Sequence, residues 1–303
     1  MGWRTIVISK PSKISLHKHN FLYTPNDDEP ISVPIDDISV IILETHQVTI
    51  TSALLSKLAS LNILLFTCDN KHIPNGVFIP FHQHSRFSLM VHMQIKWSQA
   101  FKKRVWMHII KQKIKNQSYV LQQNSKAVEA KELVNLSNQV KSGDSTNIES
   151  YSAKLYFSYL YKNFNRRDIS DWRNGAMNYG YSIIRGVISR DISSSGFIPS
   201  LGLHHKNQLN AFNLSDDIIE PYRAFVDMRV DKIFKEENLK KLDELSFNHK
   251  VKLIELLQIK VNINNENTTL LNSINIYVNS LVNCTKENNF DLILLPKFSN
   301  ARI

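Results

Sequence analysis

Residues 86–110 read RFSLMVHMQIKWSQAFKKRVWMHII. This stretch decides the fold because the spacing of apolar residues changes here from a strand-like to a helical pattern. Apolar residues recur at every third or fourth position, as they do along one face of a helix. These residues are Phe87, Met90, Met93, Trp97 and Phe101. Glycine and proline also become scarce. The pattern predicts one long helix at this point and a helical chain beyond it.

The residues before this helix have the pattern of short strands separated by turns. Polar and apolar side chains alternate, or β-branched residues cluster, which is typical of β-strands. Strands are predicted at residues 4–8, 13–17, 31–35, 38–43, 62–66 and within 71–80, with one short helix at 51–61. The predicted fold class is therefore α+β with two domains. A small N-terminal β-rich domain covers residues 1–82, and a larger all-α domain covers residues 83–303.

The helical domain contains several further segments with helical periodicity. Helices are predicted at residues 126–140, 146–163, 174–192, 213–236 and 239–257. Residues 261–270 are rich in Asn and Thr and predict a loop, and the tail starts as a helix at Leu271.

Composition places the protein in a reducing compartment. Cys68 and Cys284 are the only cysteines, so neither a disulfide framework nor a CxxC zinc site is expected. The apolar runs are too short to span a membrane, and the N-terminus has no signal-peptide pattern. We expect a bacterial-type cytoplasmic protein.

The net charge of +10 is concentrated in the helical part. Residues 1–85 carry six basic and seven acidic side chains, whereas residues 86–303 carry 31 basic and 20 acidic ones. Residues 86–125 alone contain eight Lys or Arg and no acid, which predicts a surface that contacts phosphates. The alternative is a helix that is merely solvated.

Three segments carry side chains that suit metal chemistry. The first contains Glu149, which lies four and seven residues before Ala153 and Tyr156 and so at the edge of a buried face. Its alternative role is structural, because Thr146-x-x-Glu149 has the spacing of a capping box.

The second segment is a loop that ends in two histidines. Residues 196–205 read GFIPSLGLHH, and two glycines and one proline restrict the loop. Adjacent side chains do not easily face one site, so at most one of His204 and His205 is expected to be a ligand. A hydrogen-bonded loop histidine is the alternative.

The third segment, residues 213–223, places Asp217 and Glu220 on one face of a predicted helix. Two such close carboxylates repel each other unless a cation relieves them, although acids in a first turn also suit the helix dipole. Pro221 is expected to bend the backbone here. A Glu, a His and an Asp together would suit Mg²⁺ or Mn²⁺, but the residues alone do not select this trio.

Four motifs resemble those of the CRISPR-associated integrase (Cas1) family. Residues 174–185, NGAMNYGYSIIR, resemble its Asn-x-x-x-Asn-Tyr-Gly-Tyr-x-x-x-Arg helix. The remaining motifs begin at Glu149, run from Gly196 to His205, and run from Asp217 to Arg223. The N-terminal part and the length are similar to the short form of type II systems.

The resemblance implies a metal-dependent DNA integrase or endonuclease. Such an enzyme joins the 3′-hydroxyl ends of short DNA segments to the CRISPR repeat by transesterification, and the metal is its one cofactor. It further implies that Glu149, His205 and Asp217 are catalytic and bind Mg²⁺ or Mn²⁺. Glu220 would orient a ligand or a basic neighbour. Arg223 would pair with Glu220 inside the fold, and contact with phosphate is its alternative role. The alternatives are a metal-dependent nuclease that cuts branched DNA without integration, and a non-catalytic DNA-binding scaffold.

Partners follow from the same resemblance. We expect double-stranded DNA (incoming spacer and repeat), a homodimer formed through the β domain, the small adaptation protein Cas2, and effector and accessory adaptation proteins. No membrane partner is expected. The side chains predicted to contact DNA are Lys102, Lys103, Arg104, Lys111, Arg166 and Arg167.

Overall fold

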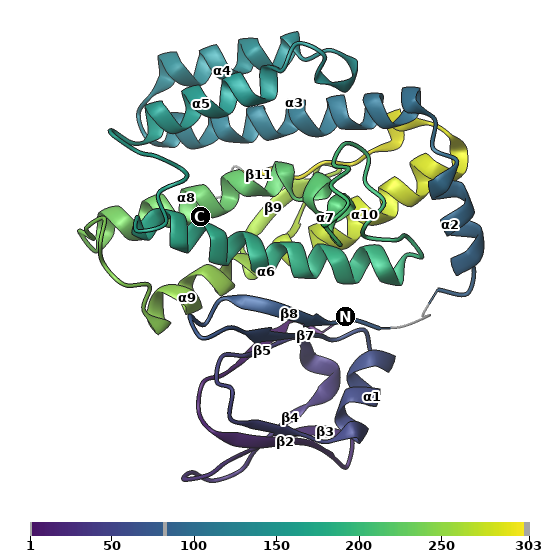
Figure 1. The fold of residues 1–303 in the computed structure, drawn as a ribbon, viewed down its shortest axis with the longest axis vertical. Helices are drawn as coiled ribbons and strands as arrows, with labels where there is room; N and C mark the ends of the chain where they lie inside the picture. Colours follow the sequence, from purple (N-terminus) through teal and green to yellow (C-terminus); the bar gives the residue numbers. More distant parts are fainter. Residues whose placement is uncertain (1, 81–83, 300–303) are drawn as a thin grey trace.

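The computed structural model describes residues 2–80 and 84–299, with a β-rich N-terminal part below a larger helical part (Figure 1). The predicted fold class is confirmed. The predicted boundary between residues 82 and 83 lies outside the described residues, so it stays a prediction. Within the described ranges, no helix combines the length and the hydropathy that crossing a membrane requires.

The N-terminal part consists of two four-stranded sheets. The first has the order β1 (Arg4–Ile8), β5 (Ile38–Leu43), β7 (Leu64–Cys68), β8 (Pro74–Phe78), with β8 antiparallel to its neighbour. The second has the order β4 (Ile31–Pro34), β3 (Asn20–Pro25), β2 (Ser12–His17), β6 (Val48–Ile50). A 3₁₀ turn, η1 (Ile35–Asp37), precedes β5, and helix α1 (Ser52–Ser60) follows β6. Strands β3 and β6 were not predicted.

Strand β5 belongs to two hydrophobic cores at once. All six of its residues are buried, and successive side chains point to opposite faces of the sheet. Ile41 and Leu43 pack between the two sheets, whereas Val40 and Ile42 pack against the helical part. The continuous apolar run Ile38–Leu43 is the pattern of a strand covered on both faces.

The helical part surrounds the long helix α6 (Trp172–Ser194), which lies directly on the first sheet (Figure 1). Above α6 lies a layer made by α3, α4 and α5 (Figure 1). The remaining elements are α2 (Phe87–Ile95), α3 (Gln99–Gln123), α4 (Ala127–Gln139), η2 (Ser142–Asp144), α5 (Ile148–Leu160), α7 (Asn213–Ile218), η3 (Glu220–Tyr222), α8 (Arg223–Glu236), α9 (Phe247–Ile254), η4 (Glu255–Gln258), α10 (Leu270–Glu287) and η5 (Phe290–Leu292).

The single long helix predicted from residue 86 is wrong, because the chain forms two helices there. The side chain of Ser98 accepts a hydrogen bond from the backbone N–H of Phe101 and so caps the start of α3. The indole of Trp97 donates to Thr285 of α10 at 3.1 Å, which fixes the break against the C-terminal helix. The apolar residues keep their helical spacing across the break between α2 and α3. The spacing therefore could not reveal that Ser98 caps a new helix.

Three further predictions need correction. Residues 213–236 form α7, η3 and α8 in place of one helix, because Pro221 cannot donate the next helical hydrogen bond. The helix predicted at 239–257 begins only at Phe247, where Ser246 and His249 form a capping box. Residues 261–270 were predicted as a loop, but they contribute to strands β9 (Lys260–Ile263) and β10 (Glu266–Thr269). With β11 (Lys297–Phe298) these strands form a small sheet in the domain predicted to be all-α.

Helix α6 joins the two parts of the molecule. A Cβ added at Gly186 would lie 2.1 Å from the ring of Phe66, so only glycine allows the helix to approach β7 this closely. Two buried polar contacts reinforce the junction. Arg190 donates to Ser39 of β5, and Lys250 of α9 forms a 2.7 Å ion pair with Glu44.

Two glycines of α6 offer a matched test of this packing. Gly175→Ala places its methyl group where no atom lies within 4 Å, and we expect it to stabilise the protein by up to about 1 kcal/mol through helix propensity. Gly186→Ala gains the same propensity but overpacks Phe66, so we expect a net loss of about 1–2 kcal/mol. Urea unfolding of both variants measures the difference. Equal stability of the two variants would contradict the close contact.

Candidate functional site

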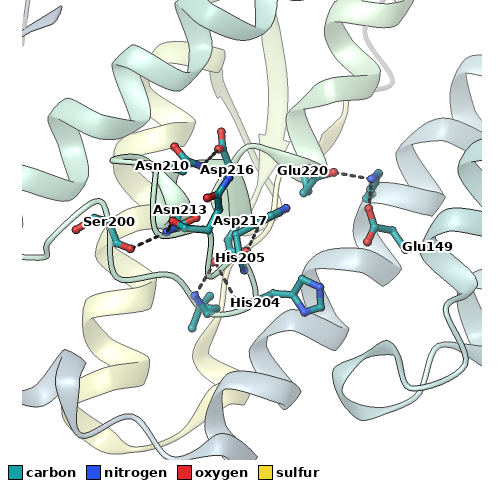
Figure 2. Close-up of polar contacts among 12 residues, drawn as sticks. Glu149, Ser200, His204, His205, Asn210, Asn213, Asp216, Asp217 and Glu220 are labelled. Atoms are coloured by element: carbon teal, nitrogen blue, oxygen red, sulfur yellow. Dashed lines mark hydrogen bonds and ion pairs between the residues drawn. The ribbon is translucent and has the colours of Figure 1, made fainter. Parts of the chain in front are cut away.

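The ammonium group of Lys113 lies between two carboxylates from other segments. Its Nζ is 2.6 Å from Oε1 of Glu149, at the start of α5, and 2.5 Å from Oε2 of Glu220, in η3. The two carboxylate oxygens are therefore no farther apart than these distances combined. Figure 2 shows the two glutamates directed toward each other. Three elements distant in sequence thus converge at one cation.

Glu149 is positioned by the turn that precedes its helix. Asp144 accepts hydrogen bonds from the backbone N–H groups of Ile148 and Glu149, at 2.9 and 3.0 Å. Asn147, at the N-cap position, has a left-handed backbone with φ of 54°. The capping-box alternative for Glu149 is wrong, because Asp144 satisfies the N–H groups and leaves the Glu149 side chain for Lys113.

Glu220 is buried and held by two cations. Its Oε1 accepts a 2.9 Å hydrogen bond from Nε of Arg223, which confirms the predicted pairing. Burial alone would raise the pKa of this carboxyl, but the charges of Arg223 and Lys113 lower it to about 2. Glu220 is therefore ionised over the whole accessible pH range. Its Oε2 forms an ion pair with Lys113, and this is the one polar contact that the oxygen makes among the described residues.

Asp217 lies behind the histidine loop with no exposed surface. Its Oδ2 accepts the backbone N–H groups of Leu203 and His204, and its Oδ1 accepts the N–H of His205. Oδ1 is also 2.7 Å from Nδ1 of the His205 ring. These four contacts occupy the carboxylate, so its function in this arrangement is to fix the loop and the orientation of the imidazole (Figure 2).

The contact with Asp217 determines both the tautomer and the basicity of His205. With Nδ1 directed at the carboxylate, Nε2 is the ring nitrogen left for a ligand. The hydrogen bond that the imidazole donates to Asp217 raises the pKa of His205, and the charges of Asp217 and Glu220 add to this effect. Figure 2 shows His205, Glu220 and Glu149 in the same region of the helical part.

The neighbouring histidine has a different environment. The ring of His204 stacks on Trp106, with centroids 4.2 Å apart and planes 1° apart. The rings of His204 and His205 are nearly perpendicular, at 88°. This arrangement agrees with the expectation that at most one histidine is a ligand and favours His205. Asp216 points away from this group, since it accepts from Asn210 and pairs with Arg185.

Gly202 explains why the loop can close over Asp217. A Cβ at this position would lie 2.5 Å from the carbonyl oxygen of His205 and 2.8 Å from Oδ2 of Asp217. A side chain would therefore displace the carboxylate from the backbone N–H groups. The glycine spacing seen in the sequence thus has a steric cause.

The donor set suits a hard divalent cation, with Lys113 between the two carboxylates. Within residues 2–80 and 84–299, no three His, Cys, Asp or Glu side chains converge tightly enough to form a ready-made metal cluster. The two glutamates and Nε2 of His205 nevertheless offer two carboxylates and one imidazole, and Oε2 of Glu220 has an unused lone pair. Oxygen donors with one imidazole fit Mg²⁺ or Mn²⁺.

Lys113 was not predicted as a site residue. It was counted among the eight basic residues expected to contact phosphate, but it is buried, so that role is wrong for this side chain. A signal was present in the sequence. Lys113 follows Ile110 by three residues and Trp106 by seven, which places it on the apolar face of α3. A lysine on a buried face needs a carboxylate partner.

The six predicted DNA contacts differ in exposure. Lys103, Arg104 and Arg167 are exposed, whereas Lys102, Lys111 and Arg166 are partly buried. Arg104 covers the ring of Phe290 at 4.6 Å, and Arg166 is held by Asn174 and Asn178. Their role in DNA binding stays a prediction.

Comparisons with known proteins converge on one family. Residues 5–258 match the family described as CRISPR associated protein Cas1. The chain is 36% identical over 298 residues, 98% of its length and 97% of the relative's, to the CRISPR-associated endonuclease Cas1 of Neisseria meningitidis serogroup C (strain 8013).

Solved structures share the fold at lower identity. A casposase bound to integration product has a TM-score of 0.75 at 19% identity, covering 99% of this chain and 96% of the casposase. A chain of a Cas6-RT-Cas1–Cas2 complex has a TM-score of 0.74 at 16% identity. That alignment covers 99% of this chain but only 36% of the longer chain, and both likenesses bear on the fold alone.

The contact between Asp217 and His205 predicts a measurable change in titration. Because this hydrogen bond is the largest cause of the raised His205 pKa, Asp217→Asn should bring the pKa back toward or below 6.5. A raised folded-state pKa stabilises the protein at pH below the unfolded value and loses that contribution as pH rises through the folded value. The variant should lose this pH dependence. NMR titration of the imidazole measures the shift, and an unchanged pKa would contradict the arrangement.

Proposed function

Because the chain belongs to the Cas1 family, we propose that it is a metal-dependent DNA integrase of CRISPR adaptation. In this reaction the 3′-hydroxyl of an incoming DNA segment attacks a phosphodiester of the CRISPR repeat, and the leaving group is the repeat's own 3′-hydroxyl. The observation that carries the proposal is the convergence of Glu149 and Glu220 on Lys113, in a chain that matches a Cas1 endonuclease over almost its whole length.

We propose Glu149, Glu220 and Nε2 of His205 as the ligands of Mg²⁺ or Mn²⁺. The sequence prediction named Asp217 in place of Glu220. The geometry favours Glu220, since its Oε2 lies opposite Glu149 and has a free lone pair, whereas Asp217 uses its oxygens on the loop. When bound, the metal would lower the pKa of the attacking hydroxyl and neutralise charge on the phosphate.

The protein's own side chains prepare the site for this chemistry. Asp217 holds His205 in one tautomer and orientation. Arg223 keeps Glu220 ionised and in place, and its guanidinium adds positive charge beside the reacting phosphate. Lys113 keeps the two glutamates close to each other before a divalent cation binds.

The proposed partners follow from charge and from the relatives. The basic surface of the helical part suits double-stranded DNA, with Lys102, Lys103 and Arg104 on one helix as sequence-independent contacts. One structurally similar chain is part of a complex that includes Cas2, which supports a Cas2-like partner. We propose that the nearly neutral β domain mediates a homodimer. Accessory adaptation proteins stay an expectation.

A nuclease activity is the second candidate, because the relative is named an endonuclease. Water in place of the 3′-hydroxyl would convert strand transfer into cleavage at the same site. The two activities differ in their products, since integration yields joined DNA and hydrolysis yields cut ends alone.

Variants of the proposed ligands test the reaction and the ligand assignment together. Strand transfer of a labelled duplex into a repeat-bearing plasmid would be measured with the Cas2-like partner and Mn²⁺. Glu149→Gln, His205→Ala and Glu220→Gln should abolish transfer, because each removes a direct ligand. Asp217→Asn should retain residual activity, with metal affinity weakened by about 10–100-fold, as expected for a residue that orients a ligand.

DNA binding without metal serves as the control, and it should persist in all four variants. If Asp217→Asn were inactive while Glu220→Gln transferred DNA, the ligand assignment would return to Asp217. If wild type cut DNA without joining it, the nuclease hypothesis would replace the integrase hypothesis. If it bound DNA but neither cut nor joined it, the scaffold reading would gain support.

Replacing Lys113 tests whether its ammonium competes with the metal. Lys113→Met leaves Glu149 and Glu220 without a counter-ion, so the metal-free protein should lose about 3 kcal/mol of stability. Its affinity for Mn²⁺ should rise about tenfold, since no cation has to be displaced. Thermal unfolding with and without Mn²⁺, together with calorimetry, measures both effects. Lys115→Met, exposed on the same helix, is the control. Unchanged or weaker Mn²⁺ binding by Lys113→Met would contradict the competition.

A further inference from the structure

A pocket lies beside Arg223, the residue that donates a hydrogen bond to Glu220. Its volume is about 220 Å³, and it opens between α6 and the α7–α8 segment. Three guanidinium groups line it, together with one carboxylate, one amide and one phenol ring. These residues are Arg166, Arg185, Arg223, Asp216, Asn178 and Tyr181. The pocket therefore has an excess of positive charge.

Arg166 contributes a positive charge that two neutral side chains orient. This charge opposes part of the rise that burial causes in the pKa of the Asp227 carboxyl. The two terminal nitrogens of Arg166 donate to the side-chain oxygens of Asn174 and Asn178, at 2.9 and 2.7 Å. Among residues 2–80 and 84–299, no carboxylate lies within ion-pair distance of this guanidinium. Neutral acceptors fix its geometry and leave its charge available to an anion.

The other two arginines are only partly compensated. Arg185 lies 3.8 Å from Asp216, its side chain is 40% exposed, and Asp216 already accepts a hydrogen bond from Asn210. Arg223 donates through Nε to Glu220, which it shares with Lys113. In the described part of the chain, the terminal nitrogens of Arg223 donate no hydrogen bond to a carboxylate. Donors from three guanidiniums thus remain for a ligand.

The size and walls of the pocket favour a phosphate over a nucleobase. Sites for drug-sized molecules usually have volumes of about 300–1,000 Å³, and this pocket is smaller. A base would need an open aromatic face. Tyr181, however, is contacted by Arg166 and Arg223, at 5.6 and 4.7 Å from its ring centroid, and Arg185 lies 5.1 Å from that of Phe212.

We propose that this pocket binds one backbone phosphate of a DNA strand, next to the phosphodiester that reacts at the Glu149 and Glu220 site. Glu220 adjoins both places, since Lys113 contacts one of its oxygens and Arg223 the other. The two places are therefore adjacent, so a strand that reacts at one would pass close to the other. The inference rests on the proposed function, because it assigns a subsite to that same DNA.

The test replaces single phosphates with neutral methylphosphonates along the 3′ end of a labelled duplex. Binding of each DNA is measured by fluorescence anisotropy without divalent metal, so catalysis does not enter. For wild type, one position should weaken binding about tenfold, the size expected for a lost charge-assisted contact. Arg185→Gln should weaken binding of unmodified DNA by a similar factor and show no further loss at that position.

Two variants control for charge and folding. Lys13→Gln, exposed on β2, removes the same charge far from the pocket and should keep the wild-type pattern. Arg166→Lys keeps the positive charge. In this variant, the methylphosphonate at the sensitive position should still weaken DNA binding, but by less than in wild type. Thermal unfolding checks that each variant is folded.

The outcomes separate the pocket from the proposed function. If wild type binds DNA but no position is sensitive, or if Arg185→Gln keeps the same sensitive position, the pocket does not hold a DNA phosphate. A third outcome is that inorganic phosphate stabilises wild type but not Arg185→Gln while no methylphosphonate position weakens DNA binding. In that case the pocket binds free anions only, and the proposal fails. If wild type does not bind DNA at all, the proposed function fails together with the subsite.

Discussion

The ion pairs of Lys113 bring together three segments that are far apart in sequence. Helix α3 supplies the ammonium, the start of α5 supplies Glu149, and the turn η3 supplies Glu220. Glu220 is buried and Glu149 is partly buried, and two carboxylates at this distance repel each other more strongly there than in water. A cation between them is therefore a condition for this packing, and the lysine supplies it from within the fold. A divalent metal would meet the same condition with a larger charge.

The β domain supports this site from a distance through helix α6. The sheet is covered by α6 because Gly186 lets the helix lie against Phe66, and buried polar contacts such as that of Arg190 with Ser39 fix its position. The same helix carries Tyr181 and Arg185 into the pocket that Arg166 and Arg223 also line. The register of α6 on the sheet thus fixes where these side chains lie relative to Glu220.

Much of the architecture could be predicted because it depends on local patterns. Alternation revealed most strands, and apolar spacing revealed most helices. The errors lie where one interaction overrides the pattern, as at Ser98, which caps a new helix inside a continuous apolar repeat. The loop predicted at 261–270 forms strands because β9 pairs with β10 and with β11, a distant partner that composition cannot show.

The candidate site was predictable only in part. The motifs located Glu149, His205, Asp217 and Glu220, but spacing could not distinguish a carboxylate that orients a histidine from one that faces a cation. That distinction depends on which lone pairs are already used. Asp217 accepts three backbone N–H groups and the imidazole, and these donors come from a loop whose path the sequence does not specify.

Glu220 links two groups of positive charge electrostatically. One is Lys113 at the proposed metal site, and the other is the pocket lined by Arg166, Arg185 and Arg223. Arg223 and Lys113 each neutralise part of the charge of the Glu220 carboxylate. If a metal displaced Lys113 from Glu220, the ammonium would lose this partner. The region beside Arg223 would then gain net positive charge. Two neighbouring DNA phosphates carry two negative charges, which this added positive charge would attract. Metal binding and strand binding should therefore favour each other. Coupling between two binding sites is reciprocal. DNA bound in the pocket of Arg166, Arg185 and Arg223 would therefore increase the affinity for the metal by the same factor as the metal increases the affinity for DNA.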